Sequence, residues 1–205
     1  FNKEPWMIPE ANRLTYGDNR LKFNNFNLSS GNQKLELRDD MSNVEKDHVG
    51  ILFSNFRLQS ILSYLNPEDE LATGSLNGEF VLEDIFNKMG FSADMSIDDL
   101  AVLQVPMGRL TLDAQSTDGD LYEMDLAIKG SDVDLDLTGD YQVSPDAANL
   151  NLNMQLNKLN MATVTGVADD FLSDGTGSIS GTMDISGTTL EPTYNGQLNF
   201  ADTGF

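Results

Sequence analysis

The sequence predicts a mainly β protein: a long, curved and mostly antiparallel sheet that carries a hydrophobic groove, with two short helices. From residue 90 onward, apolar residues recur at every second position, as in Phe91, Ala93 and Met95. Polar residues occupy the positions between them, which is typical of strands that bury one face and leave the other in water. Turn-forming residues separate these runs at the spacing expected of an antiparallel meander.

Individual strands follow from the same alternation. Residues 20–28 and 33–37 predict two strands on either side of a Ser-Ser-Gly-Asn turn, and residues 50–56 predict a third. Alternating runs predict further strands at 91–97, 110–114, 122–128, 133–137 and 150–156. In total we expect roughly nine to eleven strands.

Two segments depart from the strand period. The apolar residues of the first stand at i, i+3, i+4 and i+7, namely Leu58, Ile61, Leu62 and Leu65. This spacing predicts an amphipathic helix over residues 57–65, with Ser54 or Asn55 as its N-cap. A second helix is predicted at 160–168, with Met161, Val164 and Ala168 on its apolar face.

An internal repeat appears when the sequence is shifted by 103 residues. Thr73, Gly74, Ser75 and Gly78 then fall on Thr176, Gly177, Ser178 and Gly181. A period this long is too great for a single solenoid coil, so each unit would contain a helix and several strands. We therefore expect residues 1–205 to be one β-rich segment of a larger protein, with repeat units at about 52–103 and 155–205.

Charge and composition narrow the function classes. The chain has 33 Asp and Glu against 12 Lys and Arg, a formal net charge of -21. Such a charge repels phosphate backbones, so we expect no nucleic-acid partner. There is no cysteine, and therefore no thiol nucleophile and no disulfide framework.

The motifs that resemble catalytic or ligand sites fail in their context. Residues 173–187, SDGTGSISGTMDISG, contain a glycine spacing similar to a phosphate loop, but the helix precedes it and a strand follows, which is the reverse of a dinucleotide site. The run Asp132, Asp134, Asp136 has Leu137 where a calcium loop needs glycine. The only histidine, His48, lies in the charged turn EKDHVG. We expect no enzyme activity, no catalytic or metal residues and no cofactor.

The apolar face is the candidate functional feature. Two helices of this size cannot cover a sheet of about ten strands, which is ~48 Å wide at ~4.8 Å per strand. The sheet would close as a sandwich, close as a barrel, or remain a groove that receives another apolar molecule. In the groove hypothesis the inward residues that contact acyl chains are Phe80, Met95, Leu112, Leu126, Leu135, Leu152, Met183 and Leu198.

A family resemblance favours the groove. The stretch LNMATVTGVADDFL is followed by GTGSISGTMDISGTTLEPTYNGQLNFADTGF, in which Gly177, Gly181, Gly187, Pro192 and Gly196 mark alternating apolar strands. This pattern resembles the repeats of the AsmA-like family, and similar stretches cover most of residues 20–205. The resemblance implies a sheet curled like a taco shell around a hydrophobic interior.

The same resemblance implies a function and a location. Members of the family are periplasmic, are anchored in the inner membrane by an N-terminal helix that is not in this segment, and carry phospholipid between the inner and outer membranes. It also implies an outer-membrane barrel partner, reached through the full-length protein. A scaffold or chaperone surface for assembly of outer-membrane proteins or autotransporters is the alternative, and a closed structural β-sandwich is the second alternative.

Overall fold

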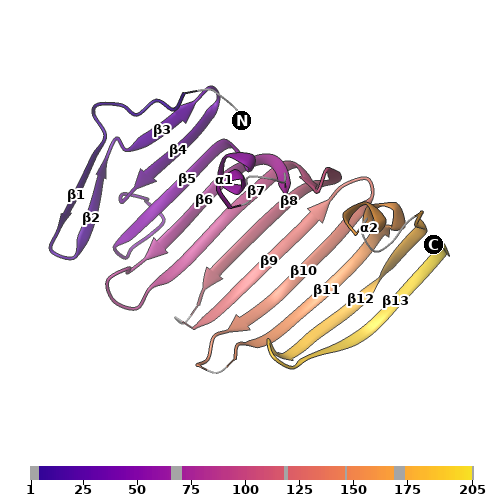
Figure 1. The fold of residues 1–205 in the computed structure, drawn as a ribbon. Coiled ribbons are helices and arrows are strands. Elements are labelled where there is room, and N and C mark those ends of the chain that lie inside the picture. The colour runs from indigo at the N-terminus through magenta and orange to yellow at the C-terminus, as the bar shows by residue number, and fades with distance from the viewer. Residues whose placement is uncertain (1–4, 66–70, 118–119, 146, 169–173, 205) are drawn as a thin grey trace.

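The computed structural model describes residues 5–65, 71–117, 120–145, 147–168 and 174–204 (Figure 1). Within them lie thirteen strands and two helices. In chain order these are β1 (Arg13–Gly17), β2 (Arg20–Asn24), β3 (Asn27–Ser30), β4 (Gln33–Arg38), β5 (His48–Arg57), α1 (Gln59–Leu65), β6 (Ala72–Glu83), β7 (Gly90–Val102), β8 (Val105–Ser116), β9 (Leu121–Lys129), β10 (Val133–Gln142), β11 (Asn149–Asn160), α2 (Met161–Val167), β12 (Thr176–Thr188) and β13 (Pro192–Gly204).

One open sheet dominates the fold. Strands β3 to β13 form an eleven-stranded sheet in which each strand pairs antiparallel with its neighbours in the sequence. Strands β3 and β13 are its two edges and do not pair with each other, while β1 and β2 form a separate hairpin. The predicted fold class is thereby confirmed. The sandwich alternative needs two large sheets packed face to face, and the described residues form one.

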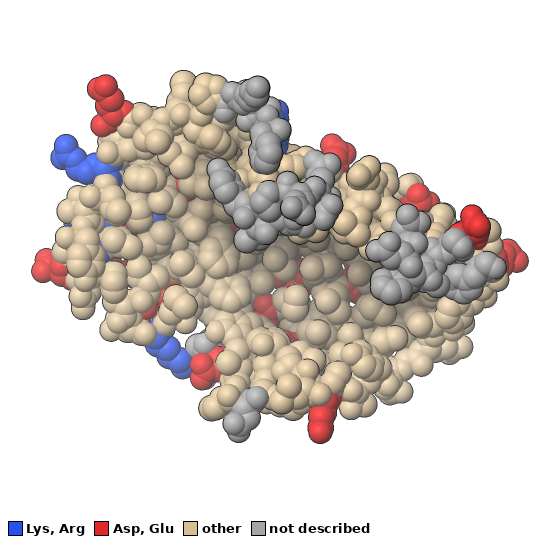
Figure 2. All heavy atoms as spheres, viewed as in Figure 1, with Lys and Arg blue, Asp and Glu red and all other residues tan. Residues whose placement is uncertain are grey.

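The sheet is curved, and one of its faces is hollowed (Figures 1 and 2). At ~4.8 Å per strand, eleven strands span roughly 50 Å, and strands of twelve or thirteen residues are ~40 Å long. Uncharged residues make up most of the hollow in Figure 2. Both helices lie at the same end of the strands, which we call the helix end (Figure 1). The opposite end carries the turns between β6 and β7, β8 and β9, β10 and β11, and β12 and β13.

The helices agree with the sequence in place but not in detail. Neither Ser54 nor Asn55 caps α1, because both lie within β5. There the strand carries a bulge opposite Asn77, whose side-chain oxygen accepts the backbone N–H of Asn55 at 2.7 Å. The residues of α2 that become buried are Met161, Thr163 and Thr165, so its predicted apolar face is wrong beyond Met161. Neither helix is long and apolar enough to cross a membrane, among the residues that the structure describes.

The predicted strand at residues 20–28 is two strands. Asn25 has a positive φ of 51°, which breaks the extended chain between β2 and β3. Asparagine tolerates this left-handed conformation better than most residues. As a result β2 leaves the large sheet to pair with β1, and β3 begins the large sheet.

The two expected repeat units share an element order and a register. Each runs strand, helix, strand, strand: β5, α1, β6 and β7 in the first unit, and β11, α2, β12 and β13 in the second. The register shifts between Thr73 and Ser75 in β6, and between Thr176 and Ser178 in β12, which is 103 residues further on. This agreement in backbone geometry supports the repeat, which stays a prediction.

Candidate functional site

The strand register arranges the hollow face in four cross-strand rows. Each row consists of residues that lie directly opposite one another on successive strands and therefore share a face. The helix-side row contains Phe56, Leu76, Ile97, Leu110, Ile128, Leu135, Leu156, Gly181 and Leu198. The central row contains Phe53, Gly78, Met95, Leu112, Leu126, Leu137, Met154, Met183 and Gly196.

Two further rows lie toward the end of the strands opposite the helices. The intermediate row contains Ile51, Phe80, Ala93, Ala114, Met124, Gly139, Leu152, Ile185 and Tyr194. The tyrosine row contains Val49, Leu82, Phe91, Ser116, Tyr122, Tyr141, Leu150, Gly187 and Pro192. No member of the four rows is charged, so the face is apolar from β5 to β13.

All eight predicted groove residues lie on this apolar face. The central row holds four of them, and the helix-side and intermediate rows hold two each. Each of the eight is half-buried. Their neighbours within the sheet cover part of each side chain, and the rest faces the hollow. The structure therefore brings the predicted residues together as one surface, while their contact with acyl chains stays a prediction.

The other face of the sheet carries the negative charge. Glu79, Asp94, Asp113 and Asp125 lie directly opposite one another on β6, β7, β8 and β9. Like charges in cross-strand pairs repel and destabilise a sheet. This row makes the two faces of the sheet electrostatically very different, with the solvated carboxylates on the side away from the hollow.

Neutralising the middle of this acidic row is expected to stabilise the protein. Asp113→Asn removes repulsion with both Asp94 and Asp125, and should raise the free energy of unfolding by about 1 kcal/mol. Urea unfolding followed by circular dichroism measures the change. The matched control is Asp184→Asn, because Asp184 accepts a hydrogen bond from Asn153 and its neutralisation should not stabilise. A loss of stability in Asp113→Asn would contradict the repulsion.

Two aspartates of the alternating run share one lysine. Lys129 Nζ donates to Asp134 Oδ1 at 2.6 Å and to Asp136 Oδ2 at 2.7 Å. These hydrogen bonds raise the pKa of Lys129, and the bonds from Lys129 and Asn157 lower the pKa of Asp134. The contribution of Asp134 to stability is therefore present at neutral pH and is lost as the pH falls through its lowered pKa. Among the described residues, no group of three or more acidic, histidine or cysteine side chains is arranged to hold a metal ion.

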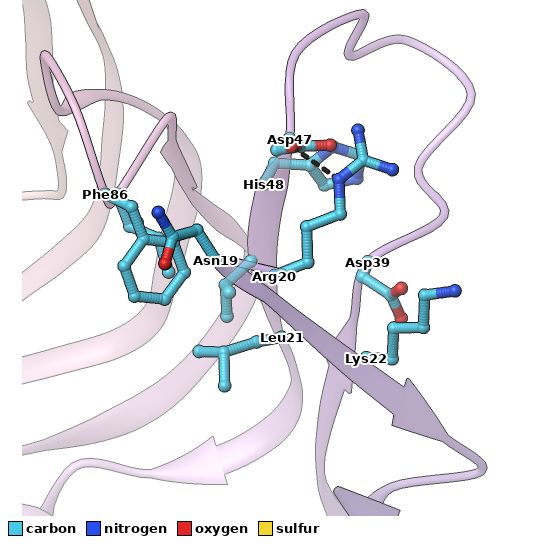
Figure 3. A pocket seen from close by; sticks show the side chains of 10 residues that line it. Asn19, Arg20, Leu21, Lys22, Asp39, Asp47, His48 and Phe86 are labelled. Atoms are coloured by element: carbon cyan, nitrogen blue, oxygen red, sulfur yellow. Dashed lines mark hydrogen bonds and ion pairs between the residues drawn. The ribbon is translucent and has the colours of Figure 1, made fainter. Parts of the chain in front are cut away.

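A small cavity lies between the β1–β2 hairpin and the large sheet (Figure 3). Its volume is about 100 Å³, and an ion pair of 2.7 Å between Arg20 and Asp47 lies beside it. His48 also lines it, but both ring nitrogens are engaged by backbone: Met41 N–H donates to Nε2 at 2.9 Å, and Nδ1 lies 2.7 Å from the Lys46 carbonyl oxygen. Four of its lining residues, Arg20, Lys22, Asp39 and Asp47, are charged, so the cavity does not suit a lipid chain.

The glycine-rich stretch at 173–187 belongs mostly to β12. Gly181 has a φ of +150° and lies against the backbone of β13, where an added Cβ would meet the carbonyl oxygen of Gln197. Gly177 similarly lies against the backbone of Ala201 and Asp202. These glycines allow close approach of two strands, and the stretch forms a strand after the helix as the sequence predicts.

Sequence reasoning missed a series of aromatic contacts on the apolar face, at the end of the strands opposite the helices. Phe80, Phe91, Tyr122 and Tyr141 form a continuous series of ring contacts across β6 to β10. Phe91 and Tyr122 are not on adjacent strands, since β8 lies between them. Only the register reveals that Ser116 separates them with a small side chain. The available signal was that Phe91 and Tyr122 each begin an alternating run.

Comparisons with protein-family models, curated proteins and solved structures find no match for this chain. The class of protein is therefore defined by the geometry of the fold alone. It is an open, curved antiparallel sheet with one continuous apolar face and one polar, strongly acidic face.

Proposed function

We propose that the apolar face holds phospholipid acyl chains, and that the chain is part of a bridge-like protein that transfers lipid between two membranes. The observation that carries this proposal is the continuity of the four rows. An uncharged surface runs from β5 to β13 without a side chain that demands a particular polar ligand. Burial of hydrocarbon is non-directional, so a chain can move from strand to strand without breaking specific bonds.

The size of the uncovered surface supports an external apolar ligand. Each helix has seven residues and is therefore ~10 Å long, against a sheet roughly 50 Å wide. Large exposed apolar surfaces on proteins mark sites of interaction. Each methylene group removed from water stabilises a complex by about 0.8 kcal/mol, so partial burial of one acyl chain supplies several kcal/mol.

The family resemblance suggests a cellular setting for this groove. The helix, glycine and proline pattern of residues 159–205 is similar to the AsmA-like family, in particular to TamB, the inner-membrane component of the translocation and assembly module. On this proposal the protein is periplasmic, is anchored in the inner membrane by a helix outside the segment, and acts with an outer-membrane barrel partner.

Site-specific photo-crosslinking tests the proposal. Leu152 lies on the apolar face of β11, and its neighbour Asn153 lies on the opposite face, where its side chain bonds Asp184. With a photoreactive amino acid at Leu152 and vesicles of phosphatidylethanolamine and phosphatidylglycerol, we expect lipid adducts. The same group at Asn153 should give none.

The outcomes separate the alternatives. Equal labelling at Leu152 and Asn153, or no lipid adduct at Leu152, would contradict the groove. If the same probe in cells captures outer-membrane polypeptide instead of lipid at Leu152, the scaffold or chaperone function is supported in its place.

A further inference from the structure

The apolar face is not equally apolar at its two ends. Its only hydroxyl groups within the four rows belong to Ser116, Tyr122 and Tyr141 in the tyrosine row and to Tyr194 in the intermediate row. The central and helix-side rows contain no hydroxyl, amide or charged side chain. The hydroxyl of Ser116 bonds the backbone of Phe91, so the tyrosines supply the polar groups of the face. Two of the three tyrosines, Tyr122 and Tyr141, stand in the row farthest from the helices.

Aromatic rings reinforce this polar end. The ring centroids of Phe80 and Phe91 are 5.6 Å apart, those of Phe91 and Tyr122 are 5.2 Å apart, and those of Tyr122 and Tyr141 are 6.2 Å apart. The first two pairs are stacked, with interplanar angles of 26° and 18°. Stacked rings cover each other's faces, so Phe91, which stacks with both Phe80 and Tyr122, does not offer the open ring face that a sugar or a cation would need.

The helix end is dry by comparison. There Val133 is 4% exposed, Leu156 is 7% exposed and Met161 of α2 is 2% exposed. The hydroxyl of Thr165 in α2 bonds back to the carbonyl oxygens of Met161 and Ala162 within the helix, so it does not add a polar group to the face. The other buried polar side chains of the two helices, Gln59 of α1 and Thr163 of α2, lie outside the four rows. Within the rows, an amphiphile thus meets hydroxyls at one end and hydrocarbon at the other.

The distance between these ends fits an acyl chain. On β9, Tyr122 stands in the tyrosine row and Ile128 stands in the helix-side row, six residues away. At ~3.3 Å per residue this is ~20 Å. One leaflet of a bilayer's hydrocarbon core is about 15 Å thick, so a chain that begins near Tyr122 ends within the apolar rows.

We propose that a glycerophospholipid lies on this face in one orientation, with its polar end at the tyrosine row and its acyl chains along the strands toward α1 and α2. This proposal rests on the proposed function and adds the direction of the bound lipid. Tyrosine hydroxyls donate to and accept from ester and phosphate oxygens, while their rings pack against the first methylenes. As the lipid moves across strands, its polar end follows the row of Tyr122 and Tyr141.

Fluorescence quenching in single-tryptophan variants tests the orientation. Trp6, the only tryptophan, packs against Phe56 and is first replaced by Trp6→Phe. Tyr122→Trp and Ile128→Trp then place the reporter at the two ends of the same strand, and Asp125→Trp places it on the opposite face. The quenchers are phosphatidylcholine with a nitroxide on its headgroup and phosphatidylcholine with a nitroxide near its chain end.

The headgroup nitroxide should quench Tyr122→Trp roughly threefold or more strongly than Ile128→Trp, because the sites are ~20 Å apart. The chain-end nitroxide should reverse this order, and Asp125→Trp should respond to neither. If Ile128→Trp does not fold, Leu110→Trp reports from the same row. Equal quenching of both ends by both lipids would overturn the orientation while the lipid groove stands. No quenching in any variant would overturn the groove itself.

Discussion

Gly181→Ala is expected to lower the free energy of unfolding by about 3 kcal/mol or more. Its φ of +150° is a conformation that non-glycine residues adopt only with strain, at a cost of about 1–3 kcal/mol. In addition, the new Cβ would press on the carbonyl oxygen of Gln197 and lie 3.0 Å from the Cα of Leu198. Both contacts are with backbone, so relief requires that β12 and β13 move apart.

A matched glycine distinguishes this effect from a general cost of losing glycine. Gly17 has no atom within 4 Å of an added Cβ and does not have a positive φ. Gly17→Ala should therefore change stability by less than about 0.5 kcal/mol. Urea unfolding measured by far-ultraviolet circular dichroism compares the two variants. A loss below about 1 kcal/mol in Gly181→Ala would mean that the strain at Gly181 is not real.

Leu126→Asp is expected to weaken phospholipid binding by about 100-fold. Leu126 lies in the centre of the apolar face, directly between Leu112 and Leu137. In the empty groove a carboxylate at this half-buried position keeps part of its water, but an acyl chain would displace that water. We expect this desolvation to cost ~3 kcal/mol, which is modest for an ion. Because each 1.4 kcal/mol changes affinity tenfold, this cost corresponds to a loss of about 100-fold in affinity.

Two controls accompany this variant. Asp125→Asn changes the adjacent residue on the acidic face, and Leu126→Met keeps an apolar side chain of similar volume. Both should bind pyrene-labelled phosphatidylcholine as the unmodified chain does, and circular dichroism reports whether each variant is folded. Unchanged binding by folded Leu126→Asp, or an equal loss in Asp125→Asn, would contradict a binding surface on this face.

The face of each groove residue was predictable from the sequence because the alternation is long and the turns are short. Within each strand the alternating apolar residues share one face, so the runs that contain Leu112 and Leu126 assign both residues to the apolar face, where the register pairs them. The break at Asn25 left a signal that the predicted strand at residues 20–28 ignored, because Phe23 and Phe26 stand three positions apart and the alternation changes phase between them. The N-cap at Ser54 or Asn55 failed because a bulge opposite Asn77 extends β5 past both residues.

The openness of the sheet lay beyond sequence reasoning for a different reason. An apolar strand face has the same alternation whether it meets a second sheet, closes on itself or remains open. The register resolves this, because β3 and β13 end as separate edges. The series from Phe80 to Tyr141 was also hidden, since Phe91 and Tyr122 lie on strands that are not adjacent and meet across a small residue, Ser116.

The central claim is that acyl chains contact this face and no other. Methionine methyl groups report on it directly, because Met95, Met124, Met154 and Met183 lie in the central and intermediate rows. Met7 and Met89 are exposed outside the rows. With ¹³C-methyl methionine and phosphatidylcholine that carries a nitroxide near its chain end, the methyl signals of the four groove methionines should broaden, while those of Met7 and Met89 persist. Equal broadening of all six, or broadening of Met7 and Met89 alone, would contradict the lipid groove.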